Sequence, residues 1–231
     1  MPMIKITPPV VASVGLLMAI AATARASTEL RLDQSAGVAS AAAQQPGTPA
    51  PAGGNAAPAT DTQLSTPTLR FGDPGRWWLS VGAGISSDFD DAIDVPVTVS
   101  AFTFVAPRLE AGLELGGWYF DQPGDSTGGV SLSGVFRYHF LQADDRDWTL
   151  FAEARIGILA GFDNVPSNGT EFNFLPGIGA GFTRRLFEDS DARLLMGVRW
   201  HHISNANTRG SDRNPGRDAA MLYGAIVFPL D

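Results

Sequence analysis

From Arg76 to the C-terminus, apolar and polar residues alternate in a series of short segments, each bounded by turn-forming residues. Alternation with a period of two places the apolar side chains of an extended chain on one face, so each segment is predicted to be a β-strand. The eight segments are residues 77–86, 95–100, 108–115, 130–140, 148–158, 172–183, 193–200 and 218–228. The last segment is apolar on both faces, so the pattern leaves open which face it buries.

Alternation alone fits either a soluble β-sandwich or a membrane β-barrel, and the polar faces favour the barrel. These faces mix small residues with charges of both signs, which suits a narrow lumen where acids and bases can pair. The charged positions are Glu110, Glu114, Arg137, Glu153, Arg155, Arg193 and Arg199. Aromatic residues also lie near segment ends, where membrane interfaces are expected. They are Trp77, Trp118, Tyr119, Trp148 and Trp200.

The connections between segments also differ in length. Those after the second, fourth and sixth segments are short, whereas the others are longer and carry Gly, Pro and Asn. Short turns on one side and long loops on the other are typical of outer-membrane barrels. The fold class predicted is therefore all-β: an eight-stranded antiparallel transmembrane β-barrel of the outer membrane of a Gram-negative bacterium. With both termini in the periplasm, the seventh strand ends at the outer leaflet.

The N-terminal third has a different composition. Lys5, an apolar run over residues 10–22 and the sequence Ala24-Arg25-Ala26 predict a secretory signal peptide over residues 1–26. A membrane anchor is the alternative. Residues 27–75 are rich in Ala, Pro and Gly, and we expect a disordered linker there. The barrel is then residues 76–231.

Overall composition excludes several classes of protein. The formal net charge of −8 argues against nucleic acid as a partner. The absence of cysteine excludes disulfide scaffolds, thiolate metal sites and cysteine nucleophiles. A divalent cation could bind at Asp88, Asp90, Asp91 and Asp94, but a solvated acidic loop is the preferred interpretation. No metal or organic cofactor is therefore expected.

The end of the seventh segment carries the candidate chemistry, in the sequence WHHISNAN that begins at Trp200. The apolar stripe of even-numbered residues continues directly into His202 and Ser204, whereas His201 is expected to face the lumen. Side chains at i and i+2 on one face have Cα atoms roughly 6.6 Å apart. An imidazole can therefore approach the serine hydroxyl on the lipid-facing side.

This pair suggests nucleophilic catalysis. A serine attacks an ester only when a base removes its proton, and histidine does so at neutral pH. A carboxylate on the other ring nitrogen would orient the base, and Asp218 opens the neighbouring strand. Asn205 can donate to a developing oxyanion. The alternative is that His202 and Ser204 are ordinary headgroup contacts.

The motif resembles a known family. The sequence from His202 to Ala206, HISNA, is similar to the His-x-Ser-Asn-Ala signature of the PagL-type lipid A 3-O-deacylases, which are outer-membrane barrels. The sequence NPGRD, from Asn214 to Asp218, resembles the Asn-x-Gly-x-acid segment that follows it. The resemblance covers residues 76–231 by architecture and 202–218 by motif.

The resemblance implies hydrolysis of the ester at position 3 of lipid A. Ser204 would be the nucleophile, His202 the general base and Asp218 the orienting acid, and Asn205 with nearby backbone amides would form the oxyanion hole. The family's acid is often Glu, so the shorter Asp218 is a departure. Asp212 in the same loop is a competing acid.

Further expectations concern binding. The loop after the motif carries Arg209, Arg213 and Arg217, whose guanidinium groups can attract lipid A phosphates or simply keep the loop soluble. The expected partners are lipopolysaccharide as substrate and the surrounding outer-membrane lipids, and a homodimer is a further expectation. The rival function is a non-catalytic barrel with a structural or adhesion role.

Overall fold

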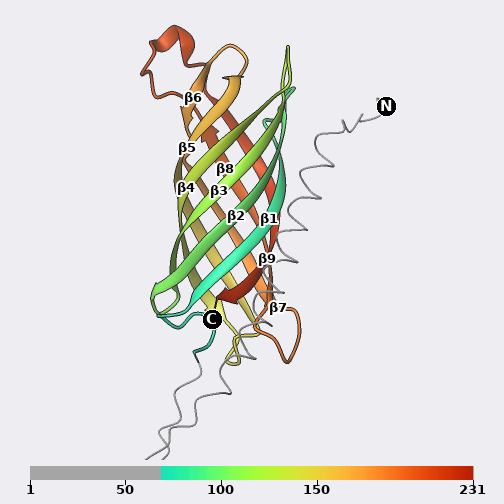
Figure 1. Cartoon of the computed structure of the whole chain (residues 1–231), viewed down its shortest axis with the longest axis vertical. Coiled ribbons are helices and arrows are strands. Elements are labelled where there is room, and N and C mark those ends of the chain that lie inside the picture. The colour runs from blue at the N-terminus through green and yellow to red at the C-terminus, as the bar shows by residue number, and fades with distance from the viewer. Residues whose placement is uncertain (1–68, 231) are drawn as a thin grey trace, which may run out of the picture. The chain divides into compact units, whose positions relative to one another are not determined.

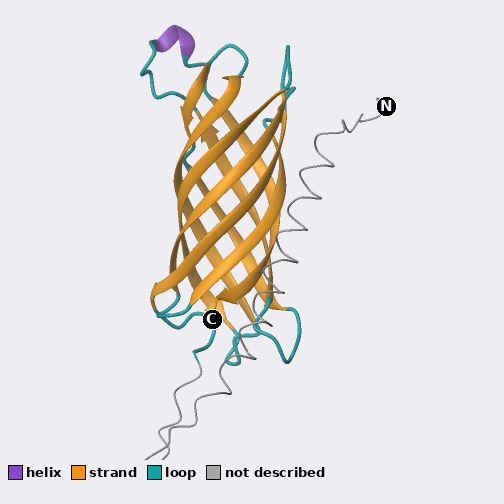
Figure 2. Cartoon of the chain, in the orientation of Figure 1, coloured by secondary structure: helices purple, strands orange, loops and turns teal. Residues whose placement is uncertain are grey.

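The computed structural model describes residues 69–230, whose strands close into an antiparallel barrel (Figures 1 and 2). The strands are β1 (Trp77–Ser87), β2 (Ile93–Ala106), β3 (Leu109–Asp121), β4 (Thr127–Gln142), β5 (Trp148–Val165), β6 (Thr170–Phe174), β7 (Gly177–Arg185), β8 (Arg193–Ile203) and β9 (Arg217–Leu230). Each strand pairs with its neighbours, β1 pairs with β9, and β6 and β7 share one side of β5. The wall therefore has eight positions, and the predicted barrel is confirmed.

The sixth predicted segment, residues 172–183, is interrupted between β6 and β7 at Leu175 and Pro176. Proline has no N–H to donate to a ladder, which explains the break. Backbone groups on both sides still bond to the neighbouring strands. The Leu175 N–H donates to the Gly157 carbonyl at 2.8 Å, and the Pro176 carbonyl accepts the His202 N–H at 3.0 Å. The barrel wall therefore stays closed at this point.

The predicted facing of side chains is confirmed along β8. Odd-numbered residues of this strand are buried and even-numbered ones are half-buried or exposed. The pattern along β9, which the sequence left open, follows the same parity. Met221, Tyr223 and Val227 point inward, whereas Leu222 and Phe228 are exposed on the outside. The residues at the start of β9 therefore have defined faces too, and this places Asp218 outside.

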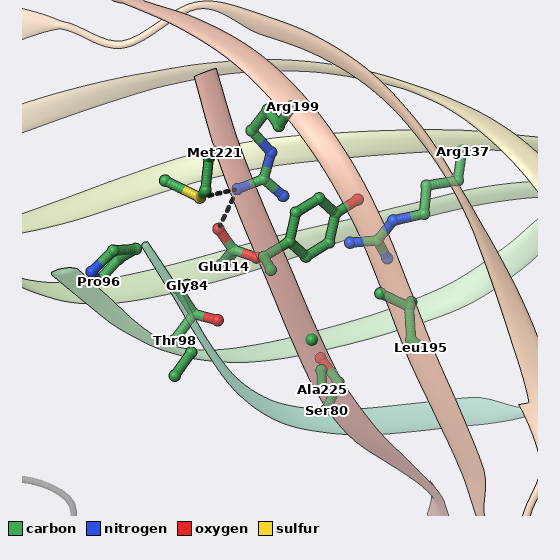
Figure 3. A pocket seen from close by; sticks show the side chains of 13 residues that line it. Ser80, Gly84, Pro96, Thr98, Glu114, Arg137, Leu195, Arg199, Met221 and Ala225 are labelled. Atoms are coloured by element: carbon green, nitrogen blue, oxygen red, sulfur yellow. Dashed lines mark hydrogen bonds and ion pairs between the residues drawn. The ribbon is translucent and has the colours of Figure 1, made fainter. Parts of the chain in front are cut away.

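Paired charges fill the middle of the lumen. The Glu153 carboxylate accepts hydrogen bonds from Arg137 at 2.8 Å, Arg199 at 2.6 Å and the Tyr223 hydroxyl at 3.1 Å. Arg199 also lies 4.0 Å from Glu114, beside a small cavity (Figure 3). Buried charges must be paired to offset the loss of hydration, so the pairing of acids and bases predicted for the lumen is confirmed.

Aromatic residues fill much of the remaining interior, and this corrects one expectation. Trp118 was expected at the membrane interface, but it is 7% exposed and faces the lumen. Its ring stacks on Phe120 with centroids 5.5 Å apart, and its indole N–H donates to Ser131. Barrels of eight strands are just wide enough for side chains to fill the interior, so inward positions take apolar rings as well as charges.

The folded part starts earlier than the predicted boundary at residue 76. Phe71 is 3% exposed and packs edge-on against Trp78 and Phe104 with centroids 4.9 and 5.0 Å away. Arg146 donates to the Phe71 carbonyl and to Asp73. Residues 69–75, which composition assigned to the linker, thus belong with the barrel. The predicted signal peptide and the rest of the linker lie outside the described residues.

Loop lengths alternate less than predicted. The turns at one end are residues 107–108, 143–147 and 186–192, and those at the other end are 88–92, 122–126, 166–169 and 204–216. Only the last is long. Strands β4 and β5 extend beyond their predicted ends and take up residues that were expected in loops. Among the described residues, no helix is long and apolar enough to cross a membrane.

Candidate active site

His202 and Asp218 are direct cross-strand partners on β8 and β9. Their side chains lie on the outer face of the barrel, where His202 Nδ1 and Asp218 Oδ1 are 2.9 Å apart. Both side chains remain partly open, with exposed fractions of 38% and 54%. This contact fixes which ring nitrogen faces the acid, and it leaves Nε2 as the nitrogen available for proton transfer.

Ser204 follows directly after the last residue of β8. Its backbone forms an isolated bridge with Phe174 of β6, through hydrogen bonds of 2.7 and 3.3 Å. The bridge holds the serine at the rim of the wall, two residues beyond His202 and half-buried. Within residues 69–230, no hydrogen bond joins Ser204 to His202. Such bonds are often long in unliganded enzymes and shorten when substrate binds.

Gly216 lies against the other edge of the imidazole. A β-carbon at this position would lie 3.2 Å from Cε1 and 3.7 Å from Nε2 of His202. The residue also has a φ of +63°, which glycine adopts without a steric cost. Absence of a side chain at 216 therefore leaves room for the ring beside Asp218.

Sequence reasoning missed a second contact of the Asp218 carboxylate. The Trp200 indole N–H donates to Asp218 Oδ1 at 3.2 Å, the same oxygen that faces His202. Trp200 was interpreted only as an interfacial aromatic. The pairing of β8 with β9 could have indicated this contact. Trp200 lies diagonally across from Asp218 in that pairing, and a long side chain can span the diagonal.

His201 faces the lumen, as predicted. It is 1% exposed, its ring packs against Trp118 with centroids 5.8 Å apart, and its Nε2 lies 3.8 Å from Asp94. The two adjacent histidines therefore lie on opposite sides of the barrel wall. Only His202 shares a face with Ser204.

The expectation that Asn205 donates to an oxyanion is not supported by the geometry. Asn205 is 1% exposed, and its side-chain amide donates to the Arg213 carbonyl at 2.6 Å and the Thr170 hydroxyl at 3.1 Å. Its backbone N–H donates to Asn214 Oδ1 at 2.9 Å. These bonds occupy all its donors, so Asn205 anchors the loop after the serine instead.

The three arginines near the motif separate into two kinds. Arg217 faces the lumen, where it is 7% exposed, pairs with Asp94 and lies over the Phe120 ring. Its odd position on β9 explains this, and it corrects the expectation that Arg217 binds substrate phosphate. Arg209 and Arg213 are exposed on the long loop.

The competing acid, Asp212, lies away from the imidazole contact. It belongs to the short 3-10 helix η1 (Ser211–Arg213), at the end of the molecule where the loop projects (Figure 2). Its carboxylate accepts a hydrogen bond from Ser211. Of the two acids considered, only Asp218 contacts His202.

No group of three or more His, Cys, Asp or Glu side chains within residues 69–230 is arranged to hold a metal ion. The acidic loop after β1 has a local structural role. One oxygen of Asp88 accepts the backbone N–H groups of Asp90 and Ala92. This pattern is typical of a side chain that stabilises a turn.

Comparisons with known proteins identify the family of the chain. A search of curated proteins gave no match. Among solved structures, Neisserial surface protein A is 13% identical, with 66% of this chain and 96% of that chain covered and a TM-score of 0.49. The outer membrane enzyme PagL is 21% identical, with 66% and 99% covered and a TM-score of 0.46. A family model described as lipid A 3-O-deacylase (PagL) matches residues 102–226, which include His202, Ser204 and Asp218. Because this match spans more than half of the sequence, the chain belongs to the PagL family of lipid A 3-O-deacylases.

Proposed function

We propose that this lipid A deacylase of the Gram-negative outer membrane is a serine hydrolase. In this proposal Ser204 is the nucleophile, His202 the general base and Asp218 the acid that orients the base. The observation that carries the proposal is the 2.9 Å contact between His202 Nδ1 and Asp218 Oδ1, on the face that also presents Ser204. A histidine in this arrangement has one nitrogen fixed and the other free to accept a proton.

The reaction follows from these roles. His202 Nε2 takes the hydroxyl proton as Ser204 Oγ attacks the carbonyl carbon of the ester at position 3. When the tetrahedral intermediate collapses, the proton passes to the departing sugar oxygen, and the acyl chain remains on Ser204. Water then attacks the acyl-enzyme with His202 as base, which releases the fatty acid and restores the serine.

The carbonyl oxygen becomes negative in both steps and needs hydrogen-bond donors. Since Asn205 is fully engaged, we assign this role to backbone N–H groups of the same loop. Ala206 and Asn207 have positive φ values of 50° and 62°, as at the centre of a type I′ turn, and the Thr208 N–H donates to the Asn205 carbonyl across it. Turns of the backbone can present neighbouring N–H groups to an anion. Both residues are exposed, two and three positions after Ser204.

The position of the triad suits a membrane substrate. His202 and Ser204 continue the outward stripe of Val198 and Trp200, which are 60% and 47% exposed. An acyl chain can therefore reach the serine sideways from the lipid, while water enters from the interface. We propose that this end of the barrel faces the outer leaflet, with Arg209 and Arg213 available to the phosphates of lipid A. A homodimer would leave a complete site in each copy, because one chain supplies all three residues.

The test is covalent labelling of the nucleophile. Purified protein in detergent is treated with a fluorophosphonate, which reacts with activated serines, and the modified peptide is identified by mass spectrometry. The proposal predicts labelling at Ser204, loss of labelling in Ser204→Ala and His202→Asn, and retention in His201→Asn. Labelling at another serine, or none in a protein that deacylates lipid A, would contradict it. A protein with neither labelling nor deacylation would favour a non-catalytic barrel.

A further inference from the structure

The Asp218 carboxylate receives two donors from one strand. Trp200 and His202 are two residues apart on the outward face of β8, and both reach across to β9. The indole N–H donates at 3.2 Å and the imidazole Nδ1 lies 2.9 Å away, both at Oδ1. Trp200 is directly opposite Ala220, whose small side chain leaves space for the indole to lean toward Asp218.

The Asp218 carboxylate must point toward His202 Nδ1 to orient the imidazole. Its short side chain has one torsion before the carboxylate, and its exposed fraction of 54% means that few neighbours restrict it. A carboxylate that rotates away from Nδ1 no longer selects the tautomer that leaves Nε2 free. A second donor on the same oxygen restricts this rotation.

We propose that Trp200 is a positioning residue for the deacylation reaction, whose indole N–H holds Asp218 in the orientation that His202 requires. The inference rests on the proposed triad. It assigns Trp200 a role beyond that of an interfacial anchor, because an anchor needs the ring and its burial in lipid but not a bond to one particular carboxylate.

Trp200→Phe separates the two roles, since it keeps an aromatic ring at the interface and removes the donor. The expected loss in kcat is about three- to thirtyfold, with KM changed less than about twofold, as for a hydrogen bond to a partly solvated charge. Trp148 is the matched control, because it is also an exposed tryptophan at the end of a strand but has no contact with the triad. Trp148→Phe is expected to leave kcat unchanged.

A double-mutant cycle gives the decisive kinetic result. If Trp200 acts through Asp218, the additional change Trp200→Phe has less than about a twofold effect in the Asp218→Ala background, where nothing remains to be positioned. The same fold loss in both backgrounds would show that Trp200 contacts substrate or lipid, and would overturn the proposal. So would full activity of Trp200→Phe, or full activity of Asp218→Ala.

A second measurement does not depend on activity. The indole N–H resonance of Trp200, identified by its absence in Trp200→Phe, is followed by ¹⁵N-edited NMR in detergent micelles. Asp218→Ala is expected to move this resonance upfield and to leave that of Trp148 in place. An unchanged resonance would overturn the contact itself. A changed resonance in a protein without deacylase activity would instead point to failure of the proposed function.

Discussion

His202 Nδ1 and Asp218 Oδ1 lie 2.9 Å apart across the β8–β9 pair, on the outer surface of the barrel wall. The contact predicts that Asp218→Ala lowers kcat about ten- to a thousandfold. The loss should be smaller than the roughly four orders of magnitude seen in buried protease triads, because solvent screens this half-exposed acid. The measurement is the initial rate of fatty-acid release from lipid A in detergent.

Two variants control this result. Asp218→Glu restores the residue type common in the family and is expected to retain activity, whereas Asp212→Ala is expected to behave like the wild type. An inactive Asp212→Ala beside a fully active Asp218→Ala would show that the assignment of the acid is wrong.

The two adjacent histidines provide a test of side-chain facing. His202→Asn removes the proposed base and should lower kcat by at least about a thousandfold while leaving stability almost unchanged, because the ring is partly exposed. His201→Asn alters a buried ring that packs on Trp118, so it should lower stability more than kcat. Rates and thermal unfolding are measured on both proteins. Equal losses of kcat would contradict the placement of His202 outside the barrel and His201 inside it.

Phe71 is predicted to close one end of the lumen. Phe71→Ala removes a ring that packs on Trp78, Phe104 and Arg193, and it should lower the free energy of unfolding by about 3 kcal/mol. Leu69→Ala, at an exposed neighbouring position, is the control and should have little effect. Urea unfolding in detergent measures both, and an unchanged free energy of unfolding in Phe71→Ala would show that this ring adds nothing to the stability of the barrel.

Asp73 makes this closure sensitive to acid. Burial raises the pKa of its carboxyl, but hydrogen bonds from the Arg70 N–H and the Arg146 guanidinium outweigh burial, and the net pKa is lowered. A lowered pKa in the folded state adds stability above the ordinary value of about 4 and loses it as the pH falls further. The Tm difference between wild type and Asp73→Asn should therefore be largest near neutrality and shrink below about pH 4. A Tm difference that grows as the pH falls would contradict the lowered pKa of Asp73.

Much of the fold follows from the sequence because side chains along each strand of a barrel alternate between the lumen and the outside. Period-two alternation predicted the facing of β8 and the position of His202, and paired lumen charges such as Glu153 and Arg199 were recognisable from their sign. Both features depend only on local pattern. The residues of the proposed triad were identified in the same way, by extending the outward stripe and by the resemblance to the family.

The remaining features depend on register and packing, which the pattern does not contain. Trp118 and Phe71 face inward because the lumen has room for rings there, and nothing in the local sequence separates these aromatics from interfacial ones. The inward position of Arg217 was not predicted, because β9 is apolar on both faces and its sequence does not show which side chains face the lumen. The contacts of Trp200 with Asp218 and of Asn205 with Arg213 required the pairing of β8 with β9 and the course of the loop.

The central claim is that Ser204 performs deacylation of lipid A, and mass spectrometry of lipid A tests it most directly. Cells of a Gram-negative host that lacks this activity are given the wild-type protein or Ser204→Ala at equal levels in the outer membrane. Wild-type cells are predicted to yield lipid A lighter by one 3-O-linked hydroxyacyl chain, and Ser204→Ala cells to yield unmodified lipid A. Loss of the same chain in Ser204→Ala cells, or unmodified lipid A in cells with folded wild-type protein, would contradict the account.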